Sequence, residues 1–257
     1  MKKSKKIDDK SIELNRFEKR AKNLIKKNLY KITSFGSDSV PYFLRTPYDY
    51  YEENLIKLIQ SHWNILEVGS GNGVHTKKLI ESNANVTASD ISQNSLKVLK
   101  KNYKNTTTKL KTIKADIEKL PFSNQSFNLV ASAGSLSYGD AFTVDNEIKR
   151  VLKPGGIFIC VDSLNNNPIY RFNRYIHYLR GGRSKITLEN MPSIKRIKRL
   201  KELYSTIEVR YFGSISYFMP LISVIFGENK SKNFSDYIDK KFSIKKSAFK
   251  FVLIAKV

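Results

Sequence analysis

The stretch 65–76, with the sequence ILEVGSGNGVHT, constrains the fold of this 257-residue chain more than any other segment. A short apolar run carries an acidic residue, Glu67, and a glycine-rich turn follows and opens a helix. Parallel α/β sheets present backbone N–H groups and a helix N-terminus to a polar ligand in this way. Val74, however, stands where the dinucleotide pattern G-x-G-x-x-G has its third glycine. Taken alone, the stretch fits an ordinary tight turn as well as a ligand site.

A second acidic residue supports the ligand-site interpretation. Asp90 ends the predicted strand 86–90 and lies about 20 residues after Gly69. At that spacing an acidic residue accepts hydrogen bonds from the hydroxyl groups of a ribose. Two independent features therefore indicate a ligand that contains a nucleoside.

Three further segments continue the alternation of strands and helices. A predicted strand over 110–115 ends at Asp116, another covers 127–132, and the segment 151–159 reads VLKPGGIFI. In the last of these, the proline and the glycines mark the turn between a helix and an apolar strand. Such an alternation predicts an α/β fold with a mostly parallel sheet and helices on both faces.

In this order and spacing, the motifs resemble those of the class I methyltransferases that depend on S-adenosylmethionine (SAM). The resemblance covers 65–163 well and the predicted final strands, 207–212 and 248–255, loosely. It implies a Rossmann-like, seven-stranded, mostly parallel sheet with an antiparallel last strand. We expect a helical N-terminal arm and cofactor lid over 1–62 and a SAM-binding core over 63–163. The remainder, 164–257, then supplies a basic helical insert after strand five, which caps the substrate, and the last two strands of the same sheet.

The resemblance implies SAM as the cofactor and S-adenosylhomocysteine as the product. It implies that Glu67 and the glycines hold the methionine part, that Asp90 binds the ribose, and that Asp116 accepts the adenine amine. Ile117 packs on the adenine ring in this interpretation, and Ser132 lies beside the methionyl end. The predicted cofactor-binding residues are Glu67, Gly69, Ser70, Gly71, Gly73, Asp90, Ile91, Asp116, Ile117 and Ser132.

The sequence indicates the acceptor of the methyl group less clearly than it indicates the cofactor. The segment 132–140, SAGSLSYGD, lacks the [ND]-P-P-[YF] motif that serves planar amide or amine nitrogens. The single cysteine, Cys160, lies in an apolar strand, so cytosine C5 methylation is disfavoured. We expect an acceptor oxygen, with Asp140 and His177 as candidate bases and His75 as a weaker candidate. Each of these side chains also has an ordinary structural explanation.

The basic insert suggests the class of acceptor. Arg171, Arg174 and Arg180 are suited to meet phosphate. The segment 162–170 also resembles, more weakly, methyltransferases of bacterial surface-polysaccharide clusters. We therefore expect a sugar, or a phosphate-linked or lipid-linked saccharide. RNA, which is not favoured because no separate RNA-binding module is visible, and a small metabolite such as a quinone are alternatives. A SAM-binding protein without activity is a further alternative, which the intact glycine loop disfavours.

The insert is expected to contain two basic helices and an apolar segment. The first helix starts at Pro168, carries the stripe Phe172, Ile176 and Leu179, and ends at Gly181-Gly182; the second covers 193–204. The apolar segment 215–226 is too short to span a membrane. It is either buried or in contact with lipid or a lipid-linked substrate.

The first 62 residues predict two more helices. From Phe17, apolar residues at helical spacing alternate with Lys and Arg, which indicates an amphipathic helix that packs across the core or lies on anionic lipid. A helix over 49–61 is expected to follow, because Pro41 and Pro47 disfavour helix before Asp49. Tyr42, Arg45 and Tyr51 are candidates for the cofactor lid, although packing of the tyrosines on the sheet is the favoured interpretation.

Charge and composition limit the partners and the compartment. The net charge is +23, with the excess in the two flanks of the chain. An anionic membrane, a phosphate-bearing substrate or a nucleic acid explains this excess, and so does a compositional drift toward Lys, Asn and Ile. One cysteine excludes an intrachain disulfide and a cysteine-cluster metal site, so no metal is predicted. Without a long apolar run or an apolar N-terminal signal, a cytoplasmic location is expected, with peripheral contact to the inner face of the membrane as an option. The oligomeric state is left open.

Overall fold

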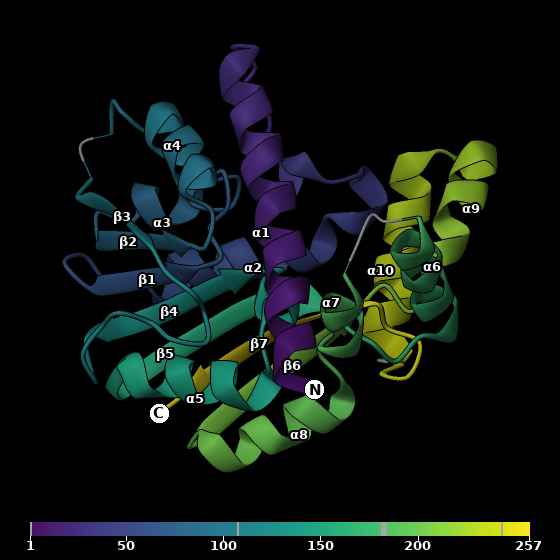
Figure 1. Cartoon of the computed structure of the whole chain (residues 1–257). Helices are drawn as coiled ribbons and strands as arrows, with labels where there is room; N and C mark the ends of the chain where they lie inside the picture. Colours follow the sequence, from purple (N-terminus) through teal and green to yellow (C-terminus); the bar gives the residue numbers. More distant parts are fainter. Residues whose placement is uncertain (1, 107, 181–183, 243) are drawn as a thin grey trace.

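A seven-stranded sheet forms the centre of the molecule. The structure is a computed structural model that describes residues 2–106, 108–180, 184–242 and 244–257. The strands run in the order β3-β2-β1-β4-β5-β7-β6 (Figure 1). Their bounds are β1 Asn64–Val68, β2 Asn85–Asp90, β3 Leu110–Lys114, β4 Phe127–Ala133, β5 Leu152–Ser163, β6 Thr206–Phe212 and β7 Lys250–Lys256.

The direction of the strands confirms the predicted fold. The pairs β1–β2, β2–β3, β1–β4 and β4–β5 are parallel, whereas β7 is antiparallel to both of its neighbours, β5 and β6. The predicted final strands therefore belong to the same sheet as the glycine-rich core.

Two clusters of buried apolar side chains cover the two faces of this sheet. On one face, α2 (Thr46–Leu58) and α3 (Lys77–Glu81) pack with Tyr51, Leu55 and Leu79 inward. On the other, α5 (Ala141–Val151) and α8 (Ile194–Leu203) pack onto β4, β5 and β7. The central strands β1, β4 and β7 are buried on both faces, as expected for a mostly parallel sheet, whereas the edge strands β3 and β6 are largely not. α4 (Gln93–Asn102) completes the layers beside β2 and β3.

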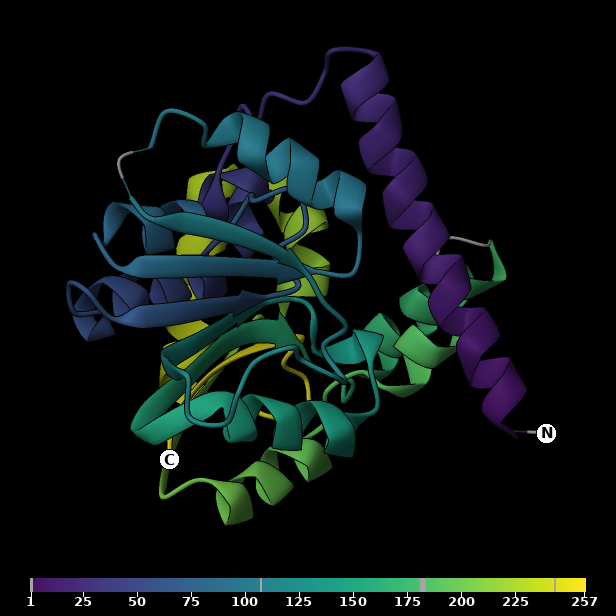
Figure 2. The same cartoon turned by 60° about the vertical axis from the view of Figure 1, so that its left-hand side comes forward.

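The first helix is longer than predicted and covers the carboxyl ends of the central strands. α1 spans Lys2–Lys26 and packs against α4 and α7 (Lys185–Glu189). Figure 2 shows it standing across the edge of the sheet, outside the layers formed by the other helices. Ala21 is buried at this contact. Of the two predicted roles, packing across the core is therefore the one that the structure shows.

The second helix begins earlier than predicted. α2 starts at Thr46, with Pro47 in its first turn, not at Asp49. The prediction was wrong because a proline in the first turn of a helix removes an N–H group that has no partner there. Of the candidate tyrosines, Tyr51 is buried against the sheet, as the packing interpretation expects. Two short 3₁₀ turns, η1 (Gly36–Ser39) and η2 (Tyr42–Leu44), precede this helix.

The chain after β5 adds helices at the β6 side of the sheet. α6 covers Pro168–Leu179, and η4 (Ser216–Phe218), α9 (Met219–Phe226) and α10 (Glu228–Phe242) follow β6. The predicted helix over 193–204 is confirmed as α8. The prediction that Gly181 and Gly182 end α6 lies outside the described residues. In the described part of the chain, no helix is both long enough and apolar enough to cross a bilayer.

Candidate functional site

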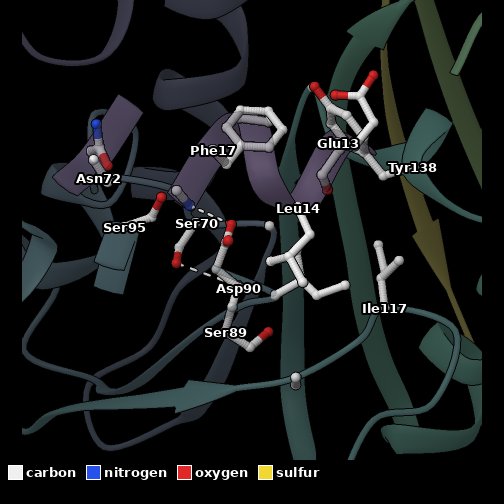
Figure 3. Close-up of a pocket in the computed structure, with 18 of the residues that line it drawn as sticks. Glu13, Leu14, Phe17, Ser70, Asn72, Ser89, Asp90, Ser95, Ile117 and Tyr138 are labelled. Carbon is white, nitrogen blue, oxygen red and sulfur yellow. Dashed lines mark hydrogen bonds between the residues drawn. The ribbon is translucent and has the colours of Figure 1, made fainter. Parts of the chain in front are cut away.

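A cavity of about 570 Å³ lies where the carboxyl ends of the central strands meet α1. Its walls come from the loops that follow β1, β2, β3 and β4, and α1 closes one side with Leu14 and Phe17 (Figure 3). The volume is within the range of small-molecule sites, about 300–1,000 Å³. Of the predicted cofactor residues, those that line the cavity are Gly69, Ser70, Gly71, Asp90, Ile91, Asp116 and Ile117.

The glycine loop has a backbone shape that requires glycine. Gly69 and Gly71 have φ values of +67° and +53°. A Cβ atom on Gly69 would lie 2.3 Å from the Cβ of Ser135, whereas a Cβ on Gly71 would meet nothing within 4 Å. The loop thus packs tightly against the β4 side at its first glycine and opens toward the cavity at its second.

Asp90 is fixed beside this loop. Its Oδ2 accepts a hydrogen bond from the Gly71 N–H at 2.9 Å (Figure 3). Its Oδ1 accepts one from the Ser92 N–H at 2.8 Å. Burial raises the pKa of this carboxyl, while the two backbone donors oppose the shift. The carboxylate is therefore held in one orientation on the cavity wall, with lone pairs left for hydroxyl donors.

Glu67 lies behind the loop and not in the cavity lining. It is buried, and its Oε2 accepts a hydrogen bond from the Thr76 hydroxyl at 2.6 Å. Burial raises the pKa of Glu67 to about 7, the Thr76 bond acts in the opposite direction, and Asp90 adds to the rise. Glu67 thus braces the two ends of the glycine loop. Gly73 and Ser132 also lie outside the lining, and the Ser132 hydroxyl shares a 2.7 Å hydrogen bond with Ser135.

Asp116 and Ile117 lie on the β3 side of the cavity. Asp116 accepts a hydrogen bond from the Glu118 N–H at 2.9 Å and forms an ion pair of 2.6 Å with Lys10 of α1. Lys10 also pairs with Glu118. The lid helix is therefore fastened to the loop that is expected to meet the adenine.

These groups suit SAM. A fixed carboxylate for the ribose, apolar contacts from Ile91, Ile117 and Leu14 for the adenine, and the open second glycine for the methionine part all face one cavity.

His75 lines the cavity, although it was the weaker candidate base in the sequence, after Asp140 and His177. Its ring stacks on Tyr48, with centroids 5.0 Å apart and planes 7° from parallel. Burial, and then the positive charge of Lys250, lower the pKa of His75 to about 4, so the ring is neutral at pH 7. Its Nδ1 is buried without a hydrogen-bond partner among the described atoms. Spacing along the chain carries no signal for this placement, because the stacking partner comes from α2.

Asp140 and His177 are not brought to the cavity lining. Asp140 is the N-cap of α5, where its Oδ1 accepts hydrogen bonds from the Thr143 N–H at 3.0 Å and the Thr143 hydroxyl at 2.8 Å. His177 is exposed on α6. The geometry supports a capping role for Asp140.

The basic and aromatic candidates of the flanks also lie elsewhere. Arg45 pairs with Asp38 at 2.7 Å, and Tyr42 and Tyr51 are absent from the cavity lining. Arg171, Arg174 and Arg180 belong to α6 or its C-terminal end and do not line the cavity. The side of the cavity is formed instead by α1, whose amphipathic spacing predicted a helix but not the surface that it covers. Within the described ranges, no group of three or more His, Cys, Asp or Glu side chains is placed to hold a metal ion.

Comparisons with known proteins agree with this geometry. Residues 66–160 match the family described as "Methyltransferase domain". A sterol 4-C-methyltransferase of Caenorhabditis elegans, strm-1, is 28% identical over 178 residues, 62% of this chain and 53% of that protein. A demethylmenaquinone methyltransferase of Lactococcus lactis is 34% identical over 118 residues, 42% of this chain and 45% of that protein. The chain thus spans about half the length of the curated relatives that it matches.

A solved structure shows the same fold over most of the chain. The geranyl diphosphate C-methyltransferase of Streptomyces coelicolor A3(2) has a TM-score of 0.56 at 17% identity, covering 81% of this chain and 78% of its own. The motif order and the cavity built around Asp90 agree with these matches. Residues 66–160 therefore match a methyltransferase domain, and they lie in a fold that this chain shares with a solved methyltransferase.

Proposed function

We propose that the protein transfers a methyl group from SAM to an acceptor that is itself a lipid or is carried on a lipid. The observation that carries this proposal is a SAM-type cavity in a molecule whose helices beyond β5 expose many large apolar side chains. Relatives named for sterol and menaquinone acceptors support it. On the same reasoning, the protein meets its acceptor at the inner face of a membrane.

SAM supplies a methyl group that its sulfonium already activates. The protein then has to orient the two reactants and exclude water. Asp90 holds the ribose, Asp116 and Ile117 meet the adenine, and the glycine loop, braced by Glu67 and Thr76, receives the methionine part. α1 closes the cavity through Leu14 and Phe17.

The low pKa of His75 bears on the acceptor atom. General-base catalysis is most efficient when the pKa of the base lies near the working pH. A ring with a pKa of about 4 is a weak base, so it hydrogen-bonds an acceptor more readily than it deprotonates an unactivated alcohol. We therefore place His75, rather than Asp140 or His177, beside the acceptor.

Two acceptor classes fit this description. An electron-rich ring carbon or an acidic hydroxyl of a quinol-type isoprenoid needs little base, and the named quinone relatives favour it. A hydroxyl oxygen of a phosphate-linked or lipid-linked saccharide is the class that the sequence predicted, with the α6 arginines near the phosphate. RNA remains the alternative that the net charge of +23 alone supports.

Methyl transfer from isotope-labelled SAM into separated lipid, glycan and RNA fractions tests the proposal. We expect the label in the lipid fraction, and NMR of the product then distinguishes a C-methyl from an O-methyl group. Label confined to RNA or to water-soluble glycan would contradict the lipid acceptor. Calorimetry with S-adenosylhomocysteine tests the cofactor site separately. Absence of binding would contradict the proposal that the protein transfers a methyl group from SAM.

A further inference from the structure

The large apolar side chains that lie exposed are concentrated on one part of the described chain. Apart from Ile12, Leu29, Ile56 and Phe142, they all fall within 169–244. They are Ile169, Phe172, Tyr175 and Leu179 on α6, Phe218, Leu221, Val224, Ile225 and Phe226 on η4 and α9, and Phe234, Tyr237, Phe242 and Ile244 on or after α10. Contiguous exposed apolar side chains mark interaction sites.

α9 presents the most exposed of these side chains. Met219 is buried and anchors the first turn, whereas Leu221, Val224 and Ile225 are 68%, 83% and 69% exposed. Residues at i, i+3 and i+4 share one side of a helix. Figure 1 shows α9 at the outer edge of the molecule, beyond α10. An apolar side of α9 therefore faces solvent.

α10 reverses the usual arrangement of an amphipathic helix. Ser231 and Ser235, one turn apart, are buried. Phe234 and Tyr237 are about half exposed. Burial of serine with exposure of aromatic rings indicates that the outer side of this helix is adapted to an apolar or interfacial environment.

α6 repeats this pattern and starts at the same place. It has no buried residue, so its predicted apolar stripe, which includes Phe172 and Leu179, is not used in the core. The side-chain amide of Asn167, its N-cap, donates to the Tyr217 hydroxyl of η4 and to the Ser247 carbonyl. α6 and α9 are thus tied together where each begins.

Positive charge accompanies these apolar side chains. The segment 168–180 contains Arg171, Arg174 and Arg180 and no acidic residue. Lys240, Lys245 and Lys246 are exposed at the end of α10 and in the loop that follows. Apolar side chains that enter the headgroup region, together with Lys and Arg that meet anionic lipids, are the combination that holds proteins on a membrane surface.

We propose that α6, η4, α9 and α10, here called the docking face, bind the surface of an anionic membrane. A second copy of the chain is the competing occupant, but two docking faces of the same positive charge repel each other, whereas anionic lipids neutralise them. α9, with its eight residues, is too short to span a bilayer and lies in the interface.

The docking face lies next to the cavity. α6 packs against α7, and Ile186 of α7 lines the cavity. If the proposed function holds, the docked molecule receives its acceptor from the membrane beside α7. The docking itself does not depend on that function.

Co-sedimentation of the full chain with lipid vesicles tests the proposal. We expect binding to phosphatidylcholine vesicles that contain about 30% phosphatidylglycerol, loss of binding in high salt, and little binding to phosphatidylcholine alone. The triple variant Leu221→Ser, Val224→Ser and Ile225→Ser should lower the partition coefficient at least about tenfold. The triple variant Lys240→Gln, Lys245→Gln and Lys246→Gln should lower it less, and should weaken its dependence on salt.

Matched controls keep the result specific. Leu29→Ser, Ile56→Ser and Phe142→Ser replace apolar side chains that are also mostly exposed, at 63%, 61% and 61%, on other elements. Lys97→Gln, Lys100→Gln and Lys104→Gln remove the same charge near α4, on the opposite side of the sheet in Figure 1. Both controls should bind vesicles within about twofold of the wild type.

Several outcomes would overturn the docking face. These are no vesicle binding by the wild type, equal binding to zwitterionic vesicles, equal loss in the controls, or a wild-type dimer that the α9 variant converts to a monomer. Circular dichroism checks that every variant is folded, whether or not the protein binds S-adenosylhomocysteine. Unchanged methyl transfer by the α9 variant to a detergent-dissolved lipid acceptor would uphold the proposed function whatever the vesicles show.

Discussion

At the scale of single residues, we expect the proposed cofactor site to depend most on Asp90. Replacing Asp90 by Ala removes a fixed carboxylate that two backbone N–H groups orient. Hydrogen bonds to a charged group contribute about 1.5–3 kcal/mol, so we expect the Kd of S-adenosylhomocysteine to rise about 10-fold to 100-fold by calorimetry. Asp140→Ala is the control, because it removes a helix cap at a cost of about 0.5–2 kcal/mol of stability. If Asp140→Ala weakened ligand binding as much as Asp90→Ala, the assignment of the two residues would be wrong.

The buried carboxyl of Glu67 makes stability depend on pH. Its pKa is about 7 in the folded protein against 4.5 ordinarily. Between these values the unfolded chain has lost this proton and the folded protein still holds it, so the free energy of unfolding falls as pH rises. The loss approaches about 3 kcal/mol above pH 7, as an order of magnitude.

Glu67→Gln isolates this effect, because its amide oxygen can still accept from Thr76. Denaturant unfolding should show that the free energy of unfolding of the variant, relative to that of the wild type, is higher at pH 8 than at pH 5. His75 acts with the opposite sign: its pKa falls from 6.5 to about 4, so its contribution is lost as pH falls through that range. The comparison therefore has to be made between wild type and variant. A difference that does not change with pH would refute the raised pKa of Glu67.

Among the elements, α1 is the one that closes one side of the cavity. It is fastened at Lys10 by ion pairs with Asp116 and Glu118, and at Glu13, whose Oε1 accepts from the Ser184 N–H at 2.8 Å. We expect α1 to move when the cofactor enters or leaves, since Leu14 and Phe17 form one wall.

Lys10→Ala should therefore speed the release of S-adenosylhomocysteine. The ion pairs are partly exposed and worth about 0.2–1 kcal/mol, which corresponds to an increase of up to about fivefold in the dissociation rate by stopped-flow measurement. Lys78→Ala is the matched control, because Lys78 pairs with Glu81 at 2.9 Å on α3 and does not touch the lid. Equal release rates in wild type and Lys10→Ala would show that this ion pair does not limit opening.

At the scale of the whole molecule, the last two strands complete the core. β7 pairs with β5 along Ile157–Ser163, and Phe251 and Leu253 are buried in the same cluster as Val144 and Ile148 of α5. The segments 63–163 and 164–257 therefore share one core. The division of the chain into 1–62, 63–163 and 164–257 is a proposal about the roles of these segments in binding cofactor and substrate.

We predict that a fragment of residues 1–163 does not fold. Removing β7 exposes one edge of β5 and the apolar side chains that β7 covers, and this loss exceeds the 5–15 kcal/mol or so that stabilises an ordinary domain. Circular dichroism should show a largely unfolded fragment, and calorimetry should show no binding of S-adenosylhomocysteine. A fragment that folded and bound the ligand would make 63–163 a domain of its own.

The sequence by itself determined the sheet and the part of the site at the carboxyl ends of its strands. Glycines at 69 and 71 and the acid at 90 act through local backbone requirements and fixed positions at strand ends. Such requirements can be read from spacing, because each strand end of a parallel sheet arrives at the same edge. The predicted turn at 154–156 lies instead in the irregular first part of β5, where Gly155 has a φ of +72°. The start of α2 was misjudged for a local reason as well, the tolerance of a first turn for proline.

Only the tertiary structure decided what covers the part of the site at the strand ends. α1 closes the cavity, His75 stacks on Tyr48 of another element, and Asp140 is used as a cap, all through contacts between segments far apart in the chain. Nor could spacing say whether the apolar segment 215–226 is buried, since the same pattern serves a core helix and a surface helix. Whether a helix side is buried depends on what packs against it, and in α9 the described chain leaves that side to solvent.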